Sequence, residues 1–374
     1  MALLSLGNID KNLIPILIGC VVCFLNRLLN QYDGTLLYKN LILANICISL
    51  SRLLAFIPYL ILKKRSKNIE NKSDDTNIIR KDKIKYLYYN QTEKIAKGKW
   101  QLILLSAIVY LMNQYLFIAT FEIKTNTWIW IILITSIFYY LMFKIKIYRH
   151  HYVSAILLLL IGIIIDIVLE NIKNDINKDL LLFLLKFIRQ ILFSLYNVMA
   201  KYIMEKKFIS VYEFSTYIGV IAFVLLVIFF IFDYTIFDIF NYKEYFNNFD
   251  YIELLVILGV ISTQFGINLC SLFTVRNNSP CHIFVMFVFG QIAYYINFEG
   301  YSIFVIICLI LILFLSLIFN EIIELNFWGL SDNTKKNIIN RAEIEDNSLI
   351  IRNDTIDSIE NEENIKELKE NIIN

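Results

Sequence analysis

The chain has 374 residues, of which 58% are hydrophobic and only 18% are charged, and its mean hydropathy is +0.60. Soluble domains of this length carry more charge and more glycine and proline, so the composition excludes an ordinary soluble protein. The net charge of +2 discriminates little, because in a membrane protein the distribution of charge along the chain matters more than its total. The sequence therefore predicts an all-α polytopic membrane protein.

Ten apolar stretches follow one another along the chain, each near the length of roughly 20 residues that one helical bilayer crossing requires. In chain order they are residues 13–31, 40–62, 100–120, 128–143, 152–169, 180–207, 213–232, 251–273, 280–296 and 301–320. They predict a short N-terminal cytosolic segment at 1–12, five crossings within 13–169, five more within 179–320, and an acidic tail at 321–374. The polar composition of that tail predicts disorder or a loosely formed helix.

The distribution of positive charge sets the predicted orientation, because cytosolic loops of membrane proteins are enriched in Lys and Arg. The loop at 63–99 holds twelve Lys or Arg against five Asp or Glu, and residues 144–151 and 201–207 are also basic. A cytosolic N-terminus puts all three in the cytosol and the acidic loop at 233–250 outside. We therefore expect an integral, multi-pass protein with both termini cytosolic. Its membrane would be either the plasma membrane or an endomembrane of the Golgi, endoplasmic reticulum or vacuole type.

Two short loops resemble each other at corresponding places in the chain. Residues 121–127, FEIKTNT, and residues 273–279, FTVRNNS, share Phe and Asn and pair Ile with Val, Lys with Arg, and Thr with Ser. The first joins the third crossing to the fourth, and the second joins the eighth to the ninth. Because five crossings separate the copies, the two halves would face opposite ways, as in the inverted repeats of alternating-access carriers. Chance similarity between loops rich in Asn and Lys is the alternative.

Two further motifs carry a family resemblance. A basic turn at 144–151 leads into YVSA and then LIG within 152–162, and LYNVMAKY occupies 195–202 in the sixth crossing. With ten short crossings in two inverted sets, residues 13–320 resemble the drug/metabolite transporter superfamily, which includes EamA-like carriers, nucleotide-sugar transporters and triose-phosphate translocators. The resemblance implies ten transmembrane helices in two inverted five-helix repeats and transport of a small polar metabolite. The lysine signatures of plastid phosphate translocators are absent from the ninth crossing, which leaves the substrate open.

Cations inside apolar stretches are candidates for binding an anionic substrate, because guanidinium and ammonium groups replace the water that the anion loses. They are Arg27, Arg52, Lys186, Arg189 and Lys201. Arg27, Arg52 and Lys201 are predicted to line a polar cavity, which favours a nucleotide sugar or another organic anion as the substrate. One alternative is a structural pairing of Arg52 with Asp166 or with helix carbonyls. Others are a Lys186 that snorkels toward headgroups and a purely topological, cytosolic role for Lys201.

Amide side chains inside the crossings could orient the substrate or could bridge helices, a common use of polar groups in membranes. Asn113 and Gln114 lie in the third crossing, Asn197 lies in the sixth, and Gln264 and Asn268 lie in the eighth. The predicted substrate-binding set is therefore Arg27, Arg52, Asn113, Gln114, Asn197, Lys201, Gln264 and Asn268.

Several motif classes are absent from the sequence. It has no nucleotide-binding loop, no HExxH zinc motif and no nucleophile elbow. We therefore expect neither an enzyme nor an ATP-driven pump, and no cofactor, metal or nucleic-acid partner. Cys20 and Cys23 have a C-x-x-C spacing without a second pair, which favours helix packing over metal binding. His150 and His151 lie in the basic turn, where contact with lipid headgroups is expected.

The sequence thus predicts a secondary-active transporter that carries a small polar metabolite across the lipid bilayer by rocking its two halves about a midplane site. The alternative is a scaffold or interaction protein on the same fold, which does not transport and uses the basic loop and the acidic tail as docking surfaces. A homodimer is compatible with either interpretation. A membrane-embedded enzyme is disfavoured, because the crossings contain no evident pair of acid and base.

Overall fold

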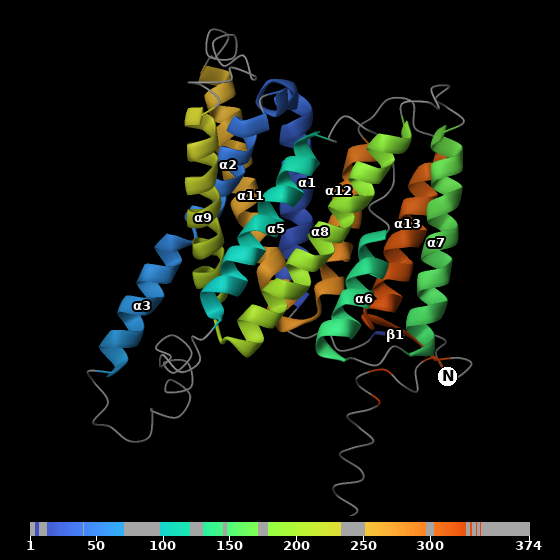
Figure 1. Cartoon of the computed structure of the whole chain (residues 1–374). Helices are drawn as coiled ribbons and strands as arrows, with labels where there is room; N and C mark the ends of the chain where they lie inside the picture. The colour runs from blue at the N-terminus through green and yellow to red at the C-terminus, as the bar shows by residue number, and fades with distance from the viewer. Residues whose placement is uncertain are drawn as a thin grey trace, which may run out of the picture.

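The computed structural model describes residues 4–6, 13–39, 41–70, 98–119, 130–144, 148–170, 179–232, 251–296, 303–326, 330, 334 and 337. Within these residues the chain is almost entirely helical, and the helices run side by side in one bundle (Figure 1). The predicted helical class is therefore confirmed.

The helices fall on the apolar stretches predicted from the sequence. The first half contains α1 (Ile14–Lys39), α2 (Leu41–Leu53), α3 (Phe56–Glu70), α5 (Lys99–Ala119), α6 (Trp130–Phe143) and α7 (Arg149–Glu170). The second half contains α8 (Asp179–Lys206), α9 (Val211–Phe232), α11 (Tyr251–Asn277), the short 3-10 helix η5 (Pro280–His282), α12 (Ile283–Ile296) and α13 (Ile303–Phe319). Most boundaries lie within a few residues of the predicted ones, because apolar length is a local property of the sequence.

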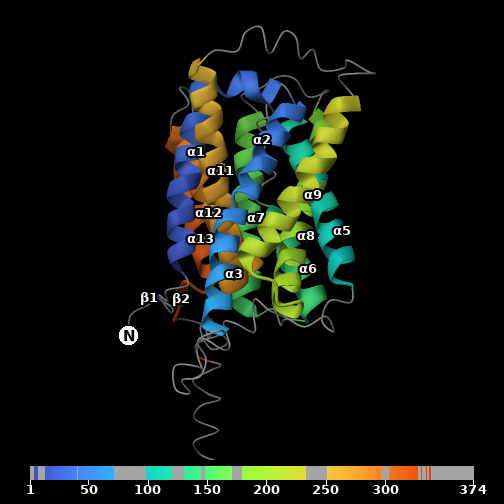
Figure 2. The same cartoon turned by 90° about the vertical axis from the view of Figure 1, so that its left-hand side faces the viewer.

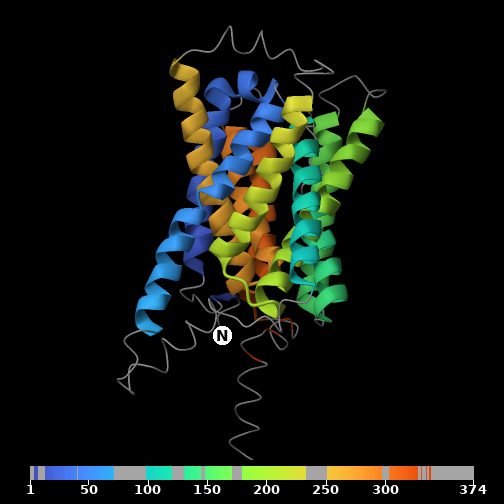
Figure 3. The ribbon, with the colours of Figure 1, turned by 60° about the vertical axis from the view of Figure 1, so that its left-hand side comes forward.

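The stretch at 40–62, predicted as one continuous crossing, is broken into α2 and α3 at Leu54 and Ala55. The cause is Pro58, which has no backbone N–H and whose ring clashes with the carbonyl four residues earlier, that of Leu54. That carbonyl accepts a hydrogen bond from the N–H of Ile57 instead, at 3.2 Å. After the break α3 leans away from the rest of the bundle (Figures 1 and 3).

The distribution of side chains is the reverse of that in a soluble bundle. On α13, for example, Phe304, Ile307, Ile310 and Leu311 are exposed at helical spacing, whereas Arg52 of α2 is buried inside. Five helical segments among the described residues are long and apolar enough to cross a membrane: Ala44–Lys64, Lys99–Phe117, Phe183–Lys206, Val211–Phe232 and Leu254–Asn277. An apolar outer surface around a partly polar interior is compatible with an integral membrane protein.

The helices pack in a defined set of pairs. α1 packs against α11 and α12, and α8 packs against α5 and α6. α2 lies between α9 and α11, as Figure 2 shows, and α7 packs against α13. The largest buried apolar cluster lies among α2, α5, α8, α9 and α11, so these five helices form the core that holds the polar residues described below.

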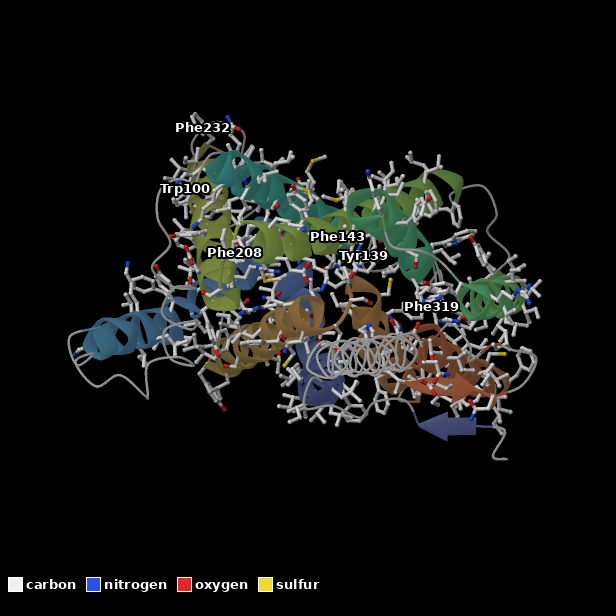
Figure 4. All side chains as sticks on the ribbon, turned by 90° about the horizontal axis from the view of Figure 1, so that it is seen from below. Trp100, Tyr139, Phe143, Phe208, Phe232 and Phe319 are labelled. Carbon is white, nitrogen blue, oxygen red and sulfur yellow. The ribbon has the colours of Figure 1, made fainter. Side chains whose placement is uncertain are left out.

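Several long-range contacts gather at one end of the bundle, the lower end in Figure 1 and the end seen in Figure 4. There the strand β1 (Leu4–Leu6), which precedes α1, pairs antiparallel with β2 (Ile323–Leu325), which follows α13. These strands were not predicted, and β2 falls in the first residues of the segment predicted to be a disordered tail. At the same end, Lys99 at the start of α5 forms an ion pair of 3.0 Å with Glu213 at the start of α9.

Candidate functional site

Arg52 is a buried cation in the last turn of α2, with only 4% of its surface exposed. Its guanidinium carbon lies 4.1 Å from the ring centre of Tyr110 on α5 and 5.3 Å from that of Tyr196 on α8. The two rings are themselves 5.4 Å apart, so the cation sits against a pair of aromatic faces. Cation–π contact of this kind stabilises a desolvated guanidinium by about 2 kcal/mol, which offsets only part of the cost of burying it.

The hydrogen-bonding capacity of Arg52 is largely unused. Among the residues that the structure describes, no carboxylate forms an ion pair with Arg52. Its Nε and Nη1 atoms are buried and make no hydrogen bond of normal geometry there. A buried charged donor without an acceptor is costly, and in a native protein it requires an explanation.

One face of α5 adds neutral polar groups next to the cation. Ser106, Tyr110 and Asn113 are all buried and follow one another at intervals of four and three residues, so they lie in one row along the helix. Within the described part of the chain, the Ser106 hydroxyl, the Tyr110 hydroxyl and the Asn113 side-chain carbonyl make no hydrogen bond of normal geometry. This row therefore offers both donors and acceptors to a polar ligand.

Two further hydroxyls on α8 and α9 extend the same environment. The hydroxyls of Tyr196 and Ser215 are buried and, as far as the structure is described, make no hydrogen bond of normal geometry. The ring of Tyr196 stacks near that of Phe214, with 6.2 Å between ring centres, so α9 contacts the same aromatic pair. Native interiors leave few buried polar atoms unpaired. The Tyr110 and Tyr196 rings contact the Arg52 guanidinium, so a buried cation beside two hydroxyls that are unpaired in the described part of the chain is the main indication of a binding site.

The surrounding helices hold Arg52 in place through close contacts. A Cβ atom built on Gly219 of α9 would lie 2.9 Å from the Leu53 backbone nitrogen and 3.0 Å from Arg52 Cβ, so only glycine allows this approach. On the other side of α2, the side-chain amide of Asn268 on α11 donates to the Ser51 hydroxyl at 3.1 Å. The break at Leu54 follows directly after Arg52. Interrupted helices that line polar cavities are a recurring device in transporters.

Lys201 is buried like Arg52, but its partners are all present. Its Nζ atom donates to the carbonyl oxygens of Val275 at 3.0 Å, Arg276 at 3.4 Å and Asn278 at 2.7 Å, and lies 2.8 Å from Glu205 Oε1. These carbonyls lie at and just beyond the C-terminus of α11, where acceptors lack helical partners and the helix dipole is negative. In this conformation Lys201 caps α11. A role in substrate binding stays a prediction and requires these contacts to break.

The other predicted site residues are distributed unevenly. Asn197 is buried, and its amide donates to the Phe193 carbonyl in its own helix at 2.9 Å. Gln114 and Gln264 are partly exposed. The side chains of Arg27 and Asp166 lie outside the described residues, so neither the role of Arg27 nor an Arg52–Asp166 pairing can be placed.

Of the predicted set, the structure brings Arg52, Asn113 and Asn268 to adjoining helices, whereas Lys201 is engaged at a helix end. Lys186 is buried, which contradicts the expectation that it extends to headgroups along the surface.

Sequence reasoning missed Tyr110, Tyr196, Ser106 and Ser215. The row that Ser106, Tyr110 and Asn113 form on α5 could have been read from their spacing, because these intervals place side chains on one helical face. Tyr196 is the tyrosine of the LYNVMAKY motif, but nothing in the sequence pairs it with Arg52. A comparison with protein-family models finds no match to the chain, and a comparison with curated protein sequences finds none either.

Proposed function

We propose that this protein is a secondary-active membrane carrier for a small organic anion, and that Arg52 binds the anionic group. The observation that carries the proposal is a buried guanidinium whose Nε and Nη1 atoms make no hydrogen bond of normal geometry, and which has no carboxylate partner, among the described residues. An anion supplies acceptors and neutralises the charge at the same time, because carboxylates and phosphates fit the planar guanidinium. The tyrosine hydroxyls and the α5 row would then bind the polar remainder of the substrate.

The pairing of helices supports two inverted five-helix repeats. We match α1 with α8, α2 with α9, α5 with α11, α6 with α12, and α7 with α13. Under this exchange, the packing of α1 on α11 and α12 becomes the packing of α8 on α5 and α6, and the pair α2–α11 becomes α9–α5. All of these pairs occur, and the pairs α2–α9 and α7–α13 map onto themselves, whereas the packing of α12 on α13 and of α8 on α11 has no equally close counterpart in α6–α7 and α1–α5. A pseudo-two-fold axis would therefore pass between α2 and α9.

Such an axis would pass close to Arg52. α9 approaches α2 closely at Gly219, which faces Arg52 and Leu53. Carriers built from inverted repeats place their substrate site at the interface of the repeats, near the middle of the membrane. The helix packing and the hydrogen bonding of Arg52 are independent observations, and both support a substrate site between α2 and α9.

The contacts at the lower end support ten alternating crossings with that end in the cytosol. The contact of Lys99 with Glu213 brings together the starts of α5 and α9, and that of Lys201 with Asn278 brings together the ends of α8 and α11. The contact of His150 with Glu321 brings the start of α7 to the end of α13. If ten crossings alternate in direction from a cytosolic N-terminus, odd-numbered crossings begin and even-numbered crossings end on the cytosolic side, which agrees with these contacts. Lys99, Lys201 and Arg276 all lie toward this end, in agreement with the enrichment of positive charge in the cytosol.

The transport cycle we propose is a rocking of the two halves about Arg52. In the described conformation the halves are joined at the lower end by the Lys99–Glu213 ion pair, which links α5 of the first half to α9 of the second. Opening toward the cytosol would break this pair. Exchange of one anion for another, or a gradient, would drive the cycle without any covalent step.

The test is counterflow into liposomes that contain the purified protein, with a panel of nucleotide sugars, sugar phosphates, carboxylates, and neutral and cationic metabolites. We expect accumulation of one anionic class above empty liposomes, and loss of that accumulation in Arg52→Gln. Arg149→Gln is the matched control, because Arg149 is an exposed arginine at the start of α7. Accumulation of only neutral or cationic compounds, or equal activity of Arg52→Gln, would refute the proposal. Silence across the panel with folded protein would favour a scaffold protein instead.

A further inference from the structure

A second cluster of polar groups lies apart from Arg52, where α7 begins and α13 ends. His150 Nε2 is 3.0 Å and His151 Nε2 is 3.9 Å from the same carboxylate oxygen, Oε1 of Glu321. The two imidazole rings are 4.0 Å apart between centres, and one ligand atom from each of the three residues lies within 4.8 Å of the others. We propose that His150, His151 and Glu321 bind a divalent transition-metal ion, with Zn²⁺ the best fit.

The separations suit a metal that is coordinated by two imidazoles and one carboxylate. With metal–ligand bonds of about 2.0–2.2 Å in a tetrahedral site, ligand atoms lie roughly 3.3 Å from each other. The observed 3.0 Å and 3.9 Å bracket that value, so small side-chain rotations complete the geometry. Two His and one Glu with an open fourth position form a recurrent zinc ligand set. Mg²⁺ and Ca²⁺ are disfavoured, because these ions select oxygen ligands.

The backbone at Glu321 is unusual for its position. Glu321 has φ of 57°, in the left-handed region, at the C-terminus of α13. The N–H of Ile322 donates to the Leu317 carbonyl and the N–H of Glu321 to the Ile318 carbonyl, which defines a helix-ending motif that normally uses glycine or asparagine. A residue with a Cβ atom pays about 1 kcal/mol for this conformation. Lys144 and Phe208 adopt the same left-handed conformation, so this backbone geometry positions the Glu321 side chain but does not by itself assign it a role.

The buried position of His150 is a second observation. His150 is 4% exposed, and its Nδ1 atom is buried without a hydrogen-bond partner in the described part of the chain. Packing rather than a second hydrogen bond therefore directs its Nε2 atom toward Glu321. His151 is held from its other side by the edge of the Phe319 ring, 5.0 Å away between centres, at the end of α13 labelled in Figure 4.

Metal binding would replace two hydrogen bonds with coordination bonds. The first joins His150 Nε2 to Glu321 Oε1 at 3.0 Å, and the ion would take the place of its proton. The second is longer and involves His151. The Tyr148 N–H donates to His151 Nδ1 at 3.4 Å, so in the described state the His151 proton is on Nε2. Coordination through Nε2 moves that proton to Nδ1 and removes the long hydrogen bond. Because the ion would join the start of α7 to the end of α13, it would fasten the first half of the chain to the second.

Zinc binding by the full-length protein tests the site without any transport assay. The protein is purified in detergent, its affinity tag is removed, residual metal is extracted with EDTA, and ZnCl₂ is titrated with MgCl₂ as the control ion. We expect one equivalent of bound zinc, and an affinity at least about tenfold lower in His151→Gln and in Glu321→Gln. The control variant is His282→Gln, because His282 is the third histidine of the chain and lies outside the cluster.

If these variants fold poorly, the ligands can be identified in the wild type instead, by electron paramagnetic resonance of the protein loaded with Cu²⁺. Hyperfine structure from two imidazole nitrogens supports the site. The proposal fails if the wild type binds no zinc, if folded cluster variants bind zinc as the wild type does, or if the copper spectrum shows thiolate ligands from the six cysteines. None of these outcomes bears on Arg52 or on the carrier proposal.

Discussion

Arg52 and Lys201 are both buried cations within apolar helices, and the sequence makes both of them candidates for the substrate site. The structure separates them. The ammonium of Lys201 donates to three backbone carbonyls and pairs with Glu205, whereas Arg52 has two nitrogen atoms without acceptors among the described residues and two tyrosine rings against it. Burial of a cation alone therefore does not mark a binding site; burial without acceptors does.

The chemistry of the two side chains explains the difference. Lysine carries a compact charge with three donors on a flexible stem, which suits a cluster of carbonyls at the end of α11. Arginine is planar, so Arg52 can stack on aromatic rings and still present donor edges to a ligand. The comparison predicts that neutralising Arg52 removes function and that neutralising Lys201 removes stability.

The largest expected effect is that of Arg52→Met on transport. Losing the buried partner of a bound anion costs about 2–5 kcal/mol, so uptake should fall by at least about 30-fold. The stability of the protein should stay the same or rise, because an apolar side chain replaces an unpaired buried charge. Counterflow measures the uptake. Thermal unfolding measures the stability, and it can be monitored by labelling buried cysteines such as Cys281 as they become exposed. A large loss of stability would show that Arg52 is a structural cation like Lys201.

Lys201→Met should have the opposite profile. Removing the ammonium leaves the terminal carbonyls of α11 without their charged donor, which should lower the free energy of unfolding by about 2–3 kcal/mol. Uptake per folded molecule should change little. Lys206→Met, at the exposed end of the same helix, is the matched control and should be close to neutral in the same unfolding assay. Normal stability combined with lost uptake would restore Lys201 to the substrate site.

The sequence was sufficient for the positions of the helices but not for their partners. Apolar length located the helices, and even the break in the second stretch was readable from Pro58, because the effect of proline on a helix is local. Which helix packs on which is decided by surfaces far apart in the chain. The difference between Arg52 and Lys201 depends on such pairings: the carbonyls at Val275 and Asn278 come to α8 from α11, and Tyr110 comes to α2 from α5.

The same reason explains the residues that sequence analysis did not find. His150 and His151 were assigned to headgroup contact because their partner, Glu321, is 171 residues beyond His150 in the chain. Tyr196 is an ordinary polar residue of an apolar helix until the fold places its ring centre 5.3 Å from the Arg52 guanidinium carbon. By contrast, Asn113 and Asn268 were predictable as polar residues within crossings, although only the structure assigns Asn268 to the contact that holds Ser51.

Gly219→Ala tests the geometry of the Arg52 environment with a smaller perturbation. The added methyl group would clash with the backbone of α2 at Leu53, which cannot move without shifting the helix, so we expect a loss of about 1–3 kcal/mol in stability and a parallel fall in uptake. Gly259→Ala is the matched control, because its new methyl would meet only the flexible end of Leu29, at 3.3 Å. Equal effects of the two substitutions in the unfolding and uptake assays would mean that close contact at Arg52 is unimportant.

The smallest expected effect concerns Lys99, the intermediate case between the two buried cations. Its side chain is 21% exposed and its one carboxylate partner, Glu213, is 11% exposed, so solvent screens the pair only partly. Partly exposed ion pairs contribute about 0.2–1 kcal/mol, and a double-mutant cycle of Lys99→Gln and Glu213→Gln should return a coupling energy in that range. The Ser210 hydroxyl accepts from the backbone N–H of Glu213 at 3.1 Å and caps α9, and Glu213→Gln keeps this bond. Only the double-mutant cycle isolates the energy of the ion pair.

A coupling energy of zero would mean that the Lys99–Glu213 pair does not hold the two halves together. A coupling well above 1 kcal/mol would place Lys99 with Lys201, as a cation whose role is structural.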